Sequence, residues 1–398
     1  MNRGVIIISA IIVTVGLSAG WFWITGLPLR MVPSPTSGIV GAISDTASDP
    51  TRKEFFAETG RRVVPFQILY PASTAGHTVA YVPNAEPVIA ALKHNQGGLG
   101  IALARIGSIT APWTASARPR TDGPFPMVIY LPGVTGYMQM SSFQTATLAA
   151  DGFVVITLNQ PGAVAAALLP DGRVIKGMSR DEAVQLIAPS YRHSHPSPAL
   201  VAKLAPEKSI VPYLAADVPA VIDRLSAING DPNHPLHGLL DLQRIGVMGV
   251  SLGAIVAAQA CQNSDQVKAC LMLDAPAPTD VANHGLGKPA LWLSRPAADQ
   301  RAERAASGGW PEYEITAQAN SIALAVANSR EARVIELRGL FHVDFTDVPT
   351  IQPIVGWLGM AGPIGALQAH RAVASLTVDF FRQMKKSPQL SGNVPARP

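Results

Sequence analysis

The chain has 398 residues, of which 48% are hydrophobic and 15% are charged, and its formal net charge is +4. This apolar fraction supports a sizeable core and excludes a wholly disordered chain. The net charge is small, and the sequence has neither a Lys/Arg cluster nor a nucleic-acid-binding motif. We therefore expect no nucleic acid among its partners.

The N-terminal segment, residues 1–30, is predicted to be a membrane anchor. The run from Gly4 to Leu29 carries no charge, and it is longer than the roughly 20 residues that span a bilayer. Arg3 before an apolar run also suits a secretory signal. However, Leu17-Ser18-Ala19 matches a cleavage site poorly, and Trp21-Phe22-Trp23 extends the apolar run. We expect an uncleaved anchor with the remaining chain on the periplasmic side. The alternatives are secretion after signal cleavage and a buried core helix.

Residues 31–51 are predicted to be a linker, because Pro, Ser, Thr, Gly and Asp dominate their composition. A strand is then expected from Arg62 to Tyr70. Pro65 within it favours an edge strand or a bulge. The segment from Gly76 to Arg120 is expected to be irregular, with its glycines in a loop and a short helix from Glu86 to His94.

An apolar run from Pro126 to Leu131 predicts a buried strand, which ends at a glycine-bearing loop from Pro132 to Gly136. A helix at 141–151 and a strand at 153–158 follow. Strand, helix and strand with short connections predict a right-handed parallel unit. The next segment, residues 160–212, is too long for a simple connection, so we expect a cap or lid.

The sequence from Arg244 to Gln262 contains Gly249-Val250-Ser251-Leu252-Gly253 between an apolar strand pattern and a helical pattern. A G-x-S-x-G at a strand-to-helix junction is typical of the nucleophile elbow of an α/β-hydrolase. The turn is so tight that Gly249 and Gly253 are needed for steric reasons. Ser251 is therefore the predicted nucleophile. The alternative is a chance match in a glycine-rich chain.

The remaining pattern alternates helices and strands, which predicts an α/β-hydrolase fold over residues 52–386. Its central sheet should be mostly parallel, with helices on both faces and a cap or lid insertion. The other predicted elements are a helix at 213–228, strands at 267–273, 289–294 and 333–337, and a helix at 364–385. A disordered tail is expected at 387–398.

Partners for the serine are expected in the chain order Ser, then Asp or Glu, then His. Asp274 directly follows the strand after Ser251, and His342 follows the last predicted strand. His342 is the predicted general base, and Asp274 would orient it and stabilise the imidazolium. The rival residues, which lie in longer predicted loops, are Asp280 and Asp299 for the acid and His284 for the base.

Two backbone N–H groups are candidates for the oxyanion hole. Leu252 follows the nucleophile at a helix start, where the N–H groups and the helix dipole favour a developing negative charge. Val134 lies in the loop after the first parallel strand, which supplies the second donor in this fold. The alternative for Val134 is an ordinary glycine turn.

Several segments, in the same order along the chain, share a further pattern. Arg244–Gly253 resembles the motif R-I-x-V-x-G-H-S-F-G, Leu273-Asp274-Ala275 an L-D-A segment, and Gly339–Asp347 a G-x-x-H-x-x-F-x-D segment. Residues 67–72, 81–83 and 125–133 resemble V-W-Y-P-A, Y-L-P and F-P-V-V-x-F-S-H-G. With these motifs the chain resembles the platelet-activating factor acetylhydrolase family, plasma or intracellular type II, in its bacterial branch. The resemblance implies Asp274 and His342 as catalytic residues, and short-acyl or oxidised phospholipids as substrates.

The sequence departs from that family near the expected acyl pocket. Pro132 replaces the usual His of the oxyanion loop, and Val250 and Leu252 replace the His and Phe that flank the serine. Pro276 stands where the family has a Trp. These replacements reshape the acyl pocket and leave the triad residues in place.

Cys261 and Cys270 are the two cysteines of the chain. One ends the predicted elbow helix and the other lies in the next strand. A disulfide would staple this turn if the chain is exported. Two buried free thiols are the alternative.

The sequence thus predicts a serine carboxylic-ester hydrolase that forms an acyl-enzyme with a small-molecule or lipid ester. No metal or organic cofactor is expected. His193 and His195 have no Cys or carboxylate cluster beside them, which favours a surface loop over a metal site. One alternative is other α/β-hydrolase chemistry: amide, dienelactone or polyester cleavage, or acyl transfer. Another is a catalytically idle ligand-binding protein with this fold.

Overall fold

The computed structural model describes residues 38–96, 98–192 and 210–386. Within those ranges, no helix is both long and apolar enough to cross a membrane. The expected anchor, the expected C-terminal tail and the pair His193 and His195 lie outside the described residues, so these predictions remain untested.

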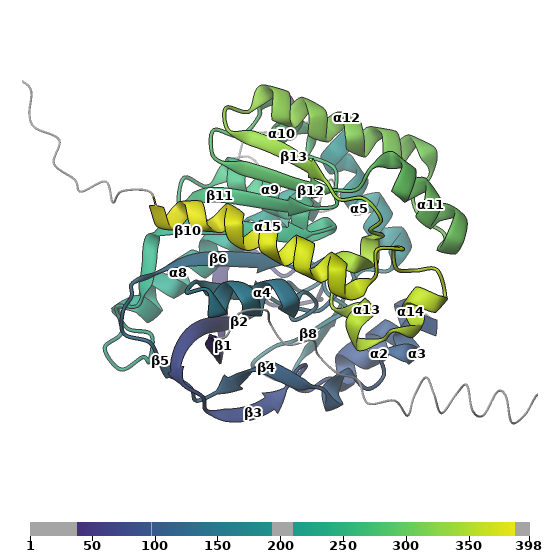
Figure 1. The fold of residues 1–398 in the computed structure, drawn as a ribbon. Helices are drawn as coiled ribbons and strands as arrows, with labels where there is room; N and C mark the ends of the chain where they lie inside the picture. Colours follow the sequence, from purple (N-terminus) through teal and green to yellow (C-terminus); the bar gives the residue numbers. More distant parts are fainter. Residues whose placement is uncertain (1–37, 97, 193–209, 387–398) are drawn as a thin grey trace, which may run out of the picture.

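A twisted mixed sheet forms the centre of the described chain (Figure 1). Its order is β13-β12-β11-β10-β6-β7-β2-β1-β4-β3, and β5 pairs with β2. The strands from β13 to β7 are parallel to one another, whereas β2 is antiparallel to both β7 and β1. The strands are β1 (Ile39–Lys53), β2 (Arg61–Thr74), β3 (His77–Ala80), β4 (Thr110–Ala115), β5 (Arg118–Pro119), β6 (Phe125–Leu131), β7 (Val154–Leu158), β10 (Leu240–Val250), β11 (Val267–Leu273), β12 (Ala290–Ser294) and β13 (Ala332–Glu336).

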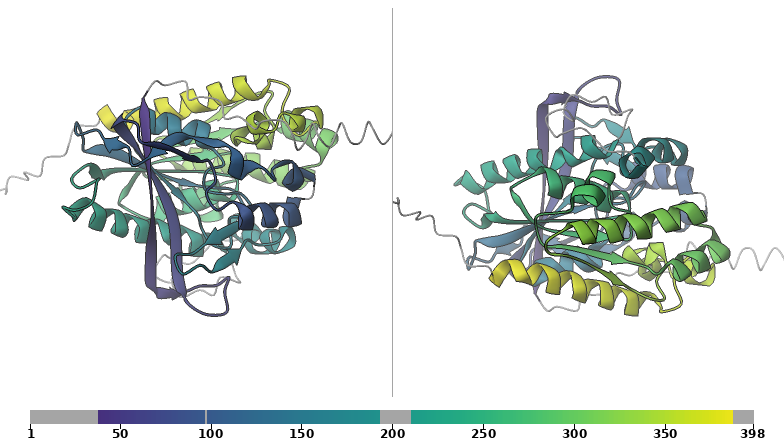
Figure 2. Two further views of the ribbon diagram at one scale, coloured as in Figure 1. Left: turned by 90° about the horizontal axis from the view of Figure 1, so that it is seen from below. Right: turned by 90° about the horizontal axis from the view of Figure 1, so that it is seen from above.

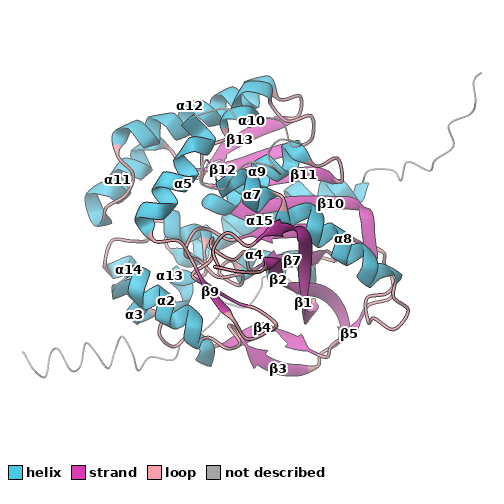
Figure 3. Cartoon of the chain, turned by 180° about the vertical axis from the view of Figure 1, so that it is seen from behind, coloured by secondary structure: helices cyan, strands magenta, loops and turns pink. Residues whose placement is uncertain are grey.

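Helices cover both faces of this sheet (Figure 2). One face carries α4 (Ser142–Ala150) and α15 (Ala366–Lys386), and the other carries α8 (Asp217–Gly230) and α9 (Leu252–Asn263). Figure 3 shows the second of these faces. The remaining helices are α2 (Glu86–Gln96), α3 (Gly98–Ala102), α5 (Arg180–Arg192), α7 (Ile210–Ala215), α10 (Thr279–His284), α11 (Ala297–Ser307), α12 (Glu312–Asn328), α13 (Val348–Ile351), α14 (Ile354–Trp357) and the 3-10 turns η1 (Ile106–Ser108) and η3 (His342–Phe345).

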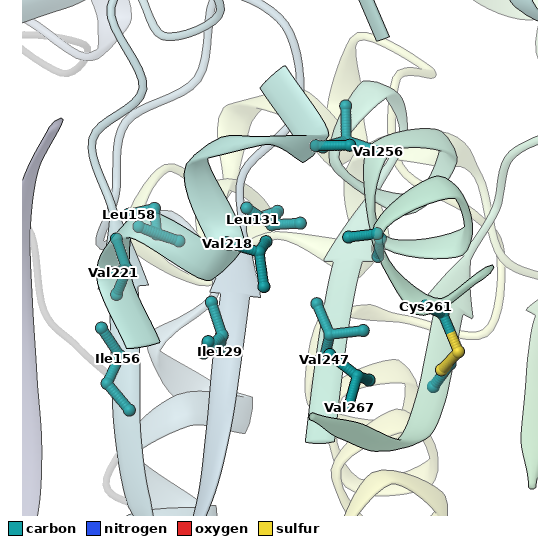
Figure 4. Close-up of a cluster of buried hydrophobic side chains, with 14 of the residues drawn as sticks. Ile129, Leu131, Ile156, Leu158, Val218, Val221, Val247, Val256, Cys261 and Val267 are labelled. Atoms are coloured by element: carbon teal, nitrogen blue, oxygen red, sulfur yellow. A yellow bond between two sulfur atoms is a disulfide. The ribbon is translucent and has the colours of Figure 1, made fainter. Parts of the chain in front are cut away.

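The apolar runs of the parallel strands supply two cores, because successive side chains of a strand point to opposite faces. In β6, Ile129 packs with the core under α8 and α9, and Tyr130 packs with the core under α15. Figure 4 shows the first core, where Val218 lies above Ile129. Strands buried on both faces need continuous apolar sequences, which is why these runs could be recognised.

The predicted linker is wrong from residue 39 onward, because β1 begins there and pairs with β2 from Ile39↔Ala72 to Asp49↔Arg62. Most of β1 is at least partly exposed, so its sequence carries few apolar residues. The folded domain therefore includes residues 39–51 and does not begin at residue 52.

Pro65 lies in an interior strand, not in the predicted edge strand, since β2 is placed between β1 and β7. Pairing with β7 ends at Phe66↔Leu158, and the Pro65 carbonyl accepts the N–H of Asn159 at 2.8 Å. Proline has no backbone N–H to donate. At Pro65 this N–H would point to the end of β7, where the pairing of β2 with β7 has already ended, so the proline removes no hydrogen bond from the sheet.

The segment from Gly76 to Arg120 is more ordered than predicted. It contains β3, β4, β5, η1 and two helices. The expected helix at Glu86 is present as α2, but Gly98 and Gly100, which were expected in a loop, belong to a second helix, α3. A Cβ at Gly100 would lie 2.1 Å from the carbonyl oxygen of Leu92, so glycine allows the two helices to approach closely.

The segment predicted as a cap, residues 160–212, has secondary structure of its own in its described parts. It forms the hairpin of β8 (Ala166–Leu168) and β9 (Val174–Lys176), then α5 and α7. The hydroxyl of Tyr191 at the end of α5 donates to Glu314 of α12 at 3.3 Å. Its role as a lid stays a prediction.

Cys261 and Cys270 are joined as a disulfide between α9 and β11, with their Cα atoms 6.2 Å apart (Figure 4). Both cysteines are buried. A cross-link that closes so short a loop lowers the conformational entropy of the unfolded chain only modestly. We expect the double substitution of both cysteines by alanine to lower the free energy of unfolding by about 2–3 kcal/mol, measured by urea denaturation. An unchanged midpoint in the double variant would contradict a stabilising disulfide.

Candidate active site

Ser251 occupies a sharp turn between β10 and α9. Its backbone has φ 56° and ψ −124°, a conformation that residues other than glycine rarely adopt. A Cβ at Gly249 would lie 2.2 Å from the oxygen of Gly253, and a Cβ at Gly253 would lie 2.0 Å from the oxygen of Leu131. Both glycines are therefore sterically required, as the sequence indicated, and the turn presents Ser251 beyond the strand end.

Asp274 lies next to Ser251 at the carboxyl edge of the sheet. The register pairs Val250 with Leu273, so the serine and the aspartate directly follow neighbouring parallel strands. The Ser251 N–H donates to the Leu273 carbonyl at 3.0 Å. Because parallel strands end at one edge, the two side chains meet where α/β sheets place their ligands.

His342 begins the 3-10 turn η3, which follows β13. Its Nδ1 atom lies 2.5 Å from Oδ2 of Asp274. The His342 side chain is 30% exposed and that of Asp274 is 1% exposed. In the neutral ring the Nδ1–H donates to the carboxylate, which leaves Nε2 as the basic nitrogen. The structure thus brings the three predicted triad residues to one edge of the sheet.

The Asp274 carboxylate stays ionised at neutral pH. Burial alone would raise its pKa, but Arg295 and His342 both contact Oδ2 and hold the pKa of the carboxyl well below its usual range. The Gln318 amide donates to the other oxygen, Oδ1, at 3.4 Å. An ionised carboxylate suits the role of orienting an imidazole and stabilising its cation.

The loop that carries Val134 lies against the serine. A Cβ at Gly133 would be 3.2 Å from Cβ of Ser251 and 3.8 Å from its Oγ. The next two N–H groups are engaged, that of Thr135 with Ala163 and that of Gly136 with Gly133. Among the described residues, no oxygen accepts the N–H of Val134. This group and the N–H of Leu252, in the first turn of α9, are therefore available to an oxyanion.

Asp347 ties the histidine segment to this loop, and sequence reasoning missed that role. Its carboxylate accepts the Ser142 N–H at 2.7 Å and the Phe143 N–H at 3.1 Å, which caps the start of α4. Its own N–H donates to the Met140 carbonyl at 2.6 Å. Tyr81 adds a third donor at 2.6 Å. The only sequence signal was the place of this aspartate at the end of the Gly339–Asp347 motif.

The rival residues lie on the helices α10 and α11. Asp280 and His284 are on α10, where the His284 ring contacts the Asp280 carbonyl at 2.9 Å. Asp299 on α11 accepts the Gly339 N–H at 2.7 Å. The carboxylate in contact with His342 is that of Asp274.

No metal site was predicted, and within the described ranges no group of His, Cys, Asp and Glu is arranged to hold a metal ion.

The parallel strands, the helices on both faces and the strand-turn-helix at Ser251 define an α/β-hydrolase fold. A ferulic acid esterase from Streptomyces cinnamoneus has a similar structure, with a TM-score of 0.67 and 22% sequence identity. The match covers 93% of this chain and 97% of the esterase. No protein-family model and no curated protein matches this chain.

Proposed function

We propose that this protein is a serine carboxylic-ester hydrolase. The contact between Nδ1 of His342 and the Asp274 carboxylate, at the strand end next to Ser251, is the observation that supports this proposal best. A serine hydroxyl is a weak nucleophile unless a base removes its proton. An oriented imidazole at the same sheet edge as a strained, partly exposed serine is the arrangement that this chemistry requires.

The reaction would run through an acyl-enzyme. Nε2 of His342 takes the proton as Ser251 Oγ attacks the ester carbonyl, and Asp274 stabilises the imidazolium that forms. The N–H groups of Leu252 and Val134 hold the oxyanion. The imidazolium then gives its proton to the departing alcohol. A water molecule, deprotonated by His342, attacks the acyl-enzyme and releases the acid and the free serine.

For the substrate we propose short-chain acyl esters, including short-acyl or oxidised phospholipids. The support is the motif resemblance to the platelet-activating factor acetylhydrolase family, in which Gly339–Asp347 carries the histidine. The solved neighbour acts on a different ester, according to its name. Pro132 and Leu252 at the oxyanion site depart from the family pattern, so the acyl group is the part of the proposal that needs a direct assay.

A fluorophosphonate probe and an ester panel test the proposal. The probe should label the folded protein once, on Ser251, as found by peptide mass spectrometry. A panel of p-nitrophenyl esters from acetyl to palmitoyl, beside an oxidised phospholipid, should show the highest kcat/KM for short acyl groups. A folded protein that neither reacts with the probe nor cleaves any ester would favour a catalytically idle ligand-binding protein.

We further propose that residues 1–30 tether the enzyme on the periplasmic side of the membrane. We expect the full chain to stay with the membrane through a carbonate wash. A chain beginning at Ser37 should be soluble and as active, because the first strand starts at Ile39. The mass of the native N-terminus provides the check. A mature chain that begins at Gly20 or Trp21 would mean a cleaved signal, and soluble full-length protein would exclude both forms of export.

A further inference from the structure

Arg295 is a buried cation that directly follows β12, and sequence reasoning assigned it no role. Its side chain is 1% exposed. Its Nε donates to Oδ2 of Asp274 at 2.8 Å, the same oxygen that contacts His342. A second guanidinium nitrogen, Nη1, is paired with the carboxylate of Glu303 on α11. Oδ2 of Asp274 therefore has two cationic or proton-donating neighbours, Arg295 directly after β12 and His342 on η3.

Glu303 completes a closed ring of contacts. One of its oxygens pairs with Arg295, and the other, Oε1, accepts the backbone N–H of His342 at 3.1 Å. This closed ring of contacts thus connects the His342 imidazole to Asp274, Asp274 to Arg295, Arg295 to Glu303, and Glu303 back to the backbone of His342. Both the side chain and the main chain of the histidine are held by it.

Burying these charged groups lowers the stability of the folded state, which argues for a role beyond packing. Asp274, Arg295 and Glu303 are all buried. Removing charges from water costs free energy that their attraction only partly offsets, and apolar residues of similar volume are often as stable. Arg295 contacts the Asp274 carboxylate, and Glu303 accepts the backbone N–H of His342. Their charges therefore act directly on the catalytic pair.

We infer that Arg295 and Glu303 are positioning residues for the proposed ester hydrolysis, and that they tune the His342 base in opposite directions. This inference rests on the proposed function. Arg295 compensates the charge of Asp274, which makes the imidazolium less favourable. Glu303 offsets Arg295, which makes the imidazolium more favourable. The closed set of contacts also fixes the orientation of the imidazole, because both the side chain and the backbone of His342 are tied.

Two other charged groups, Asp344 and Asp299, face this region. Asp344, on η3, accepts the Phe341 N–H at 2.7 Å, and burial raises its pKa to about 6. Asp299, on α11, accepts the Gly339 N–H. Both groups are acidic, so Arg295 is the cation, among these charged residues, that acts on Asp274 and His342. Arg295 also lowers the pKa of Asp344 and Glu303 raises it, so opposite shifts of the kinetic profile must be assigned to His342 by following its imidazole directly.

The test compares Arg295→Gln with Glu303→Gln, using kcat/KM against pH for a short p-nitrophenyl ester. We expect the midpoint of the acid limb to rise by about half a pH unit or more in Arg295→Gln and to fall by a similar amount in Glu303→Gln. Glu303→Gln keeps an oxygen for the His342 N–H, so its effect reports charge. Arg295→Lys keeps the positive charge but loses the forked guanidinium, which contacts both Asp274 and Glu303. We therefore expect kcat to fall with little change in the midpoint of the acid limb.

The same shifts should be seen without turnover, in the titration of the His342 imidazole by proton NMR in a Ser251→Ala background. If Arg295→Gln does not fold, the fall of the midpoint in Glu303→Gln and the loss of kcat in Arg295→Lys decide the matter. Midpoints that stay at the wild-type value, or that move in the same direction, would overturn the inference while wild-type esterase activity left the proposed function standing. A wild-type protein without ester hydrolysis would remove both.

Discussion

Replacing Ser251 by alanine is expected to lower kcat for ester hydrolysis by about four to six orders of magnitude. The residue stands at the tight turn between β10 and α9, with φ 56°, and no acyl-enzyme can form without its Oγ. Residual hydrolysis above the rate in water would come from the oxyanion donors and from substrate binding. The measurement is the initial rate on a short p-nitrophenyl ester at high enzyme concentration.

The loss should leave the fold intact, because alanine keeps the Cβ and removes a single oxygen from a partly exposed residue. Thermal unfolding followed by circular dichroism should therefore agree with the wild type within a few degrees. Ser108→Ala is a matched control, since Ser108 is an exposed serine whose hydroxyl bonds only locally to the Arg105 carbonyl. It should retain full activity. Near wild-type turnover in Ser251→Ala would show that the proposed mechanism is wrong.

The parallel half of the sheet could be predicted closely from the sequence. The strand expected at 267–273 is present with the same bounds as β11, and β6 and β12 differ from the predicted strands by one residue. These strands are buried on both faces, so their apolar runs are continuous and unmistakable. Strand β1 gave no such signal, because only part of it is buried and most of its residues are polar or small.

The helical region between β11 and β13 was not predicted for a similar reason. Helix α11 buries Gln300 and Glu303, two polar residues, so no row of large apolar side chains marks its buried face in the sequence. Helix α12 does bury Ile315 and Ile322 at helical spacing, a signal that was available in the sequence.

The triad could be predicted because each member directly follows or closely follows a recognisable strand. The residues that support it could not. Arg295 and Glu303 read as surface charges in a sequence, since such residues are rarely buried unless they are paired. Their pairing with Asp274 and with the His342 N–H depends on how β12 and α11 pack, and local patterns carry no information on that packing.

Replacing His342 by alanine should cost about as much activity as losing the serine, because nucleophile and base act as a unit. Asp274→Asn should cost about ten- to a hundred-fold less, since the imidazole would still be present but misoriented. Arg295 would keep its partner Glu303 in that variant, so the fold should survive. The values to compare are kcat on one ester, each with a thermal unfolding curve.

The pH profile separates the two roles. Arg295 and His342 hold the pKa of Asp274 well below its usual range, so this carboxylate stays ionised wherever the enzyme is folded and active. We therefore expect the fall in rate at low pH to come from protonation of the His342 base and not from protonation of Asp274. Asp280→Asn is the matched control, because that aspartate lies on α10, and it should leave both kcat and the profile unchanged. Damage from Asp280→Asn with a silent Asp274→Asn would refute the assignment of the acid, even if Ser251 and His342 proved essential.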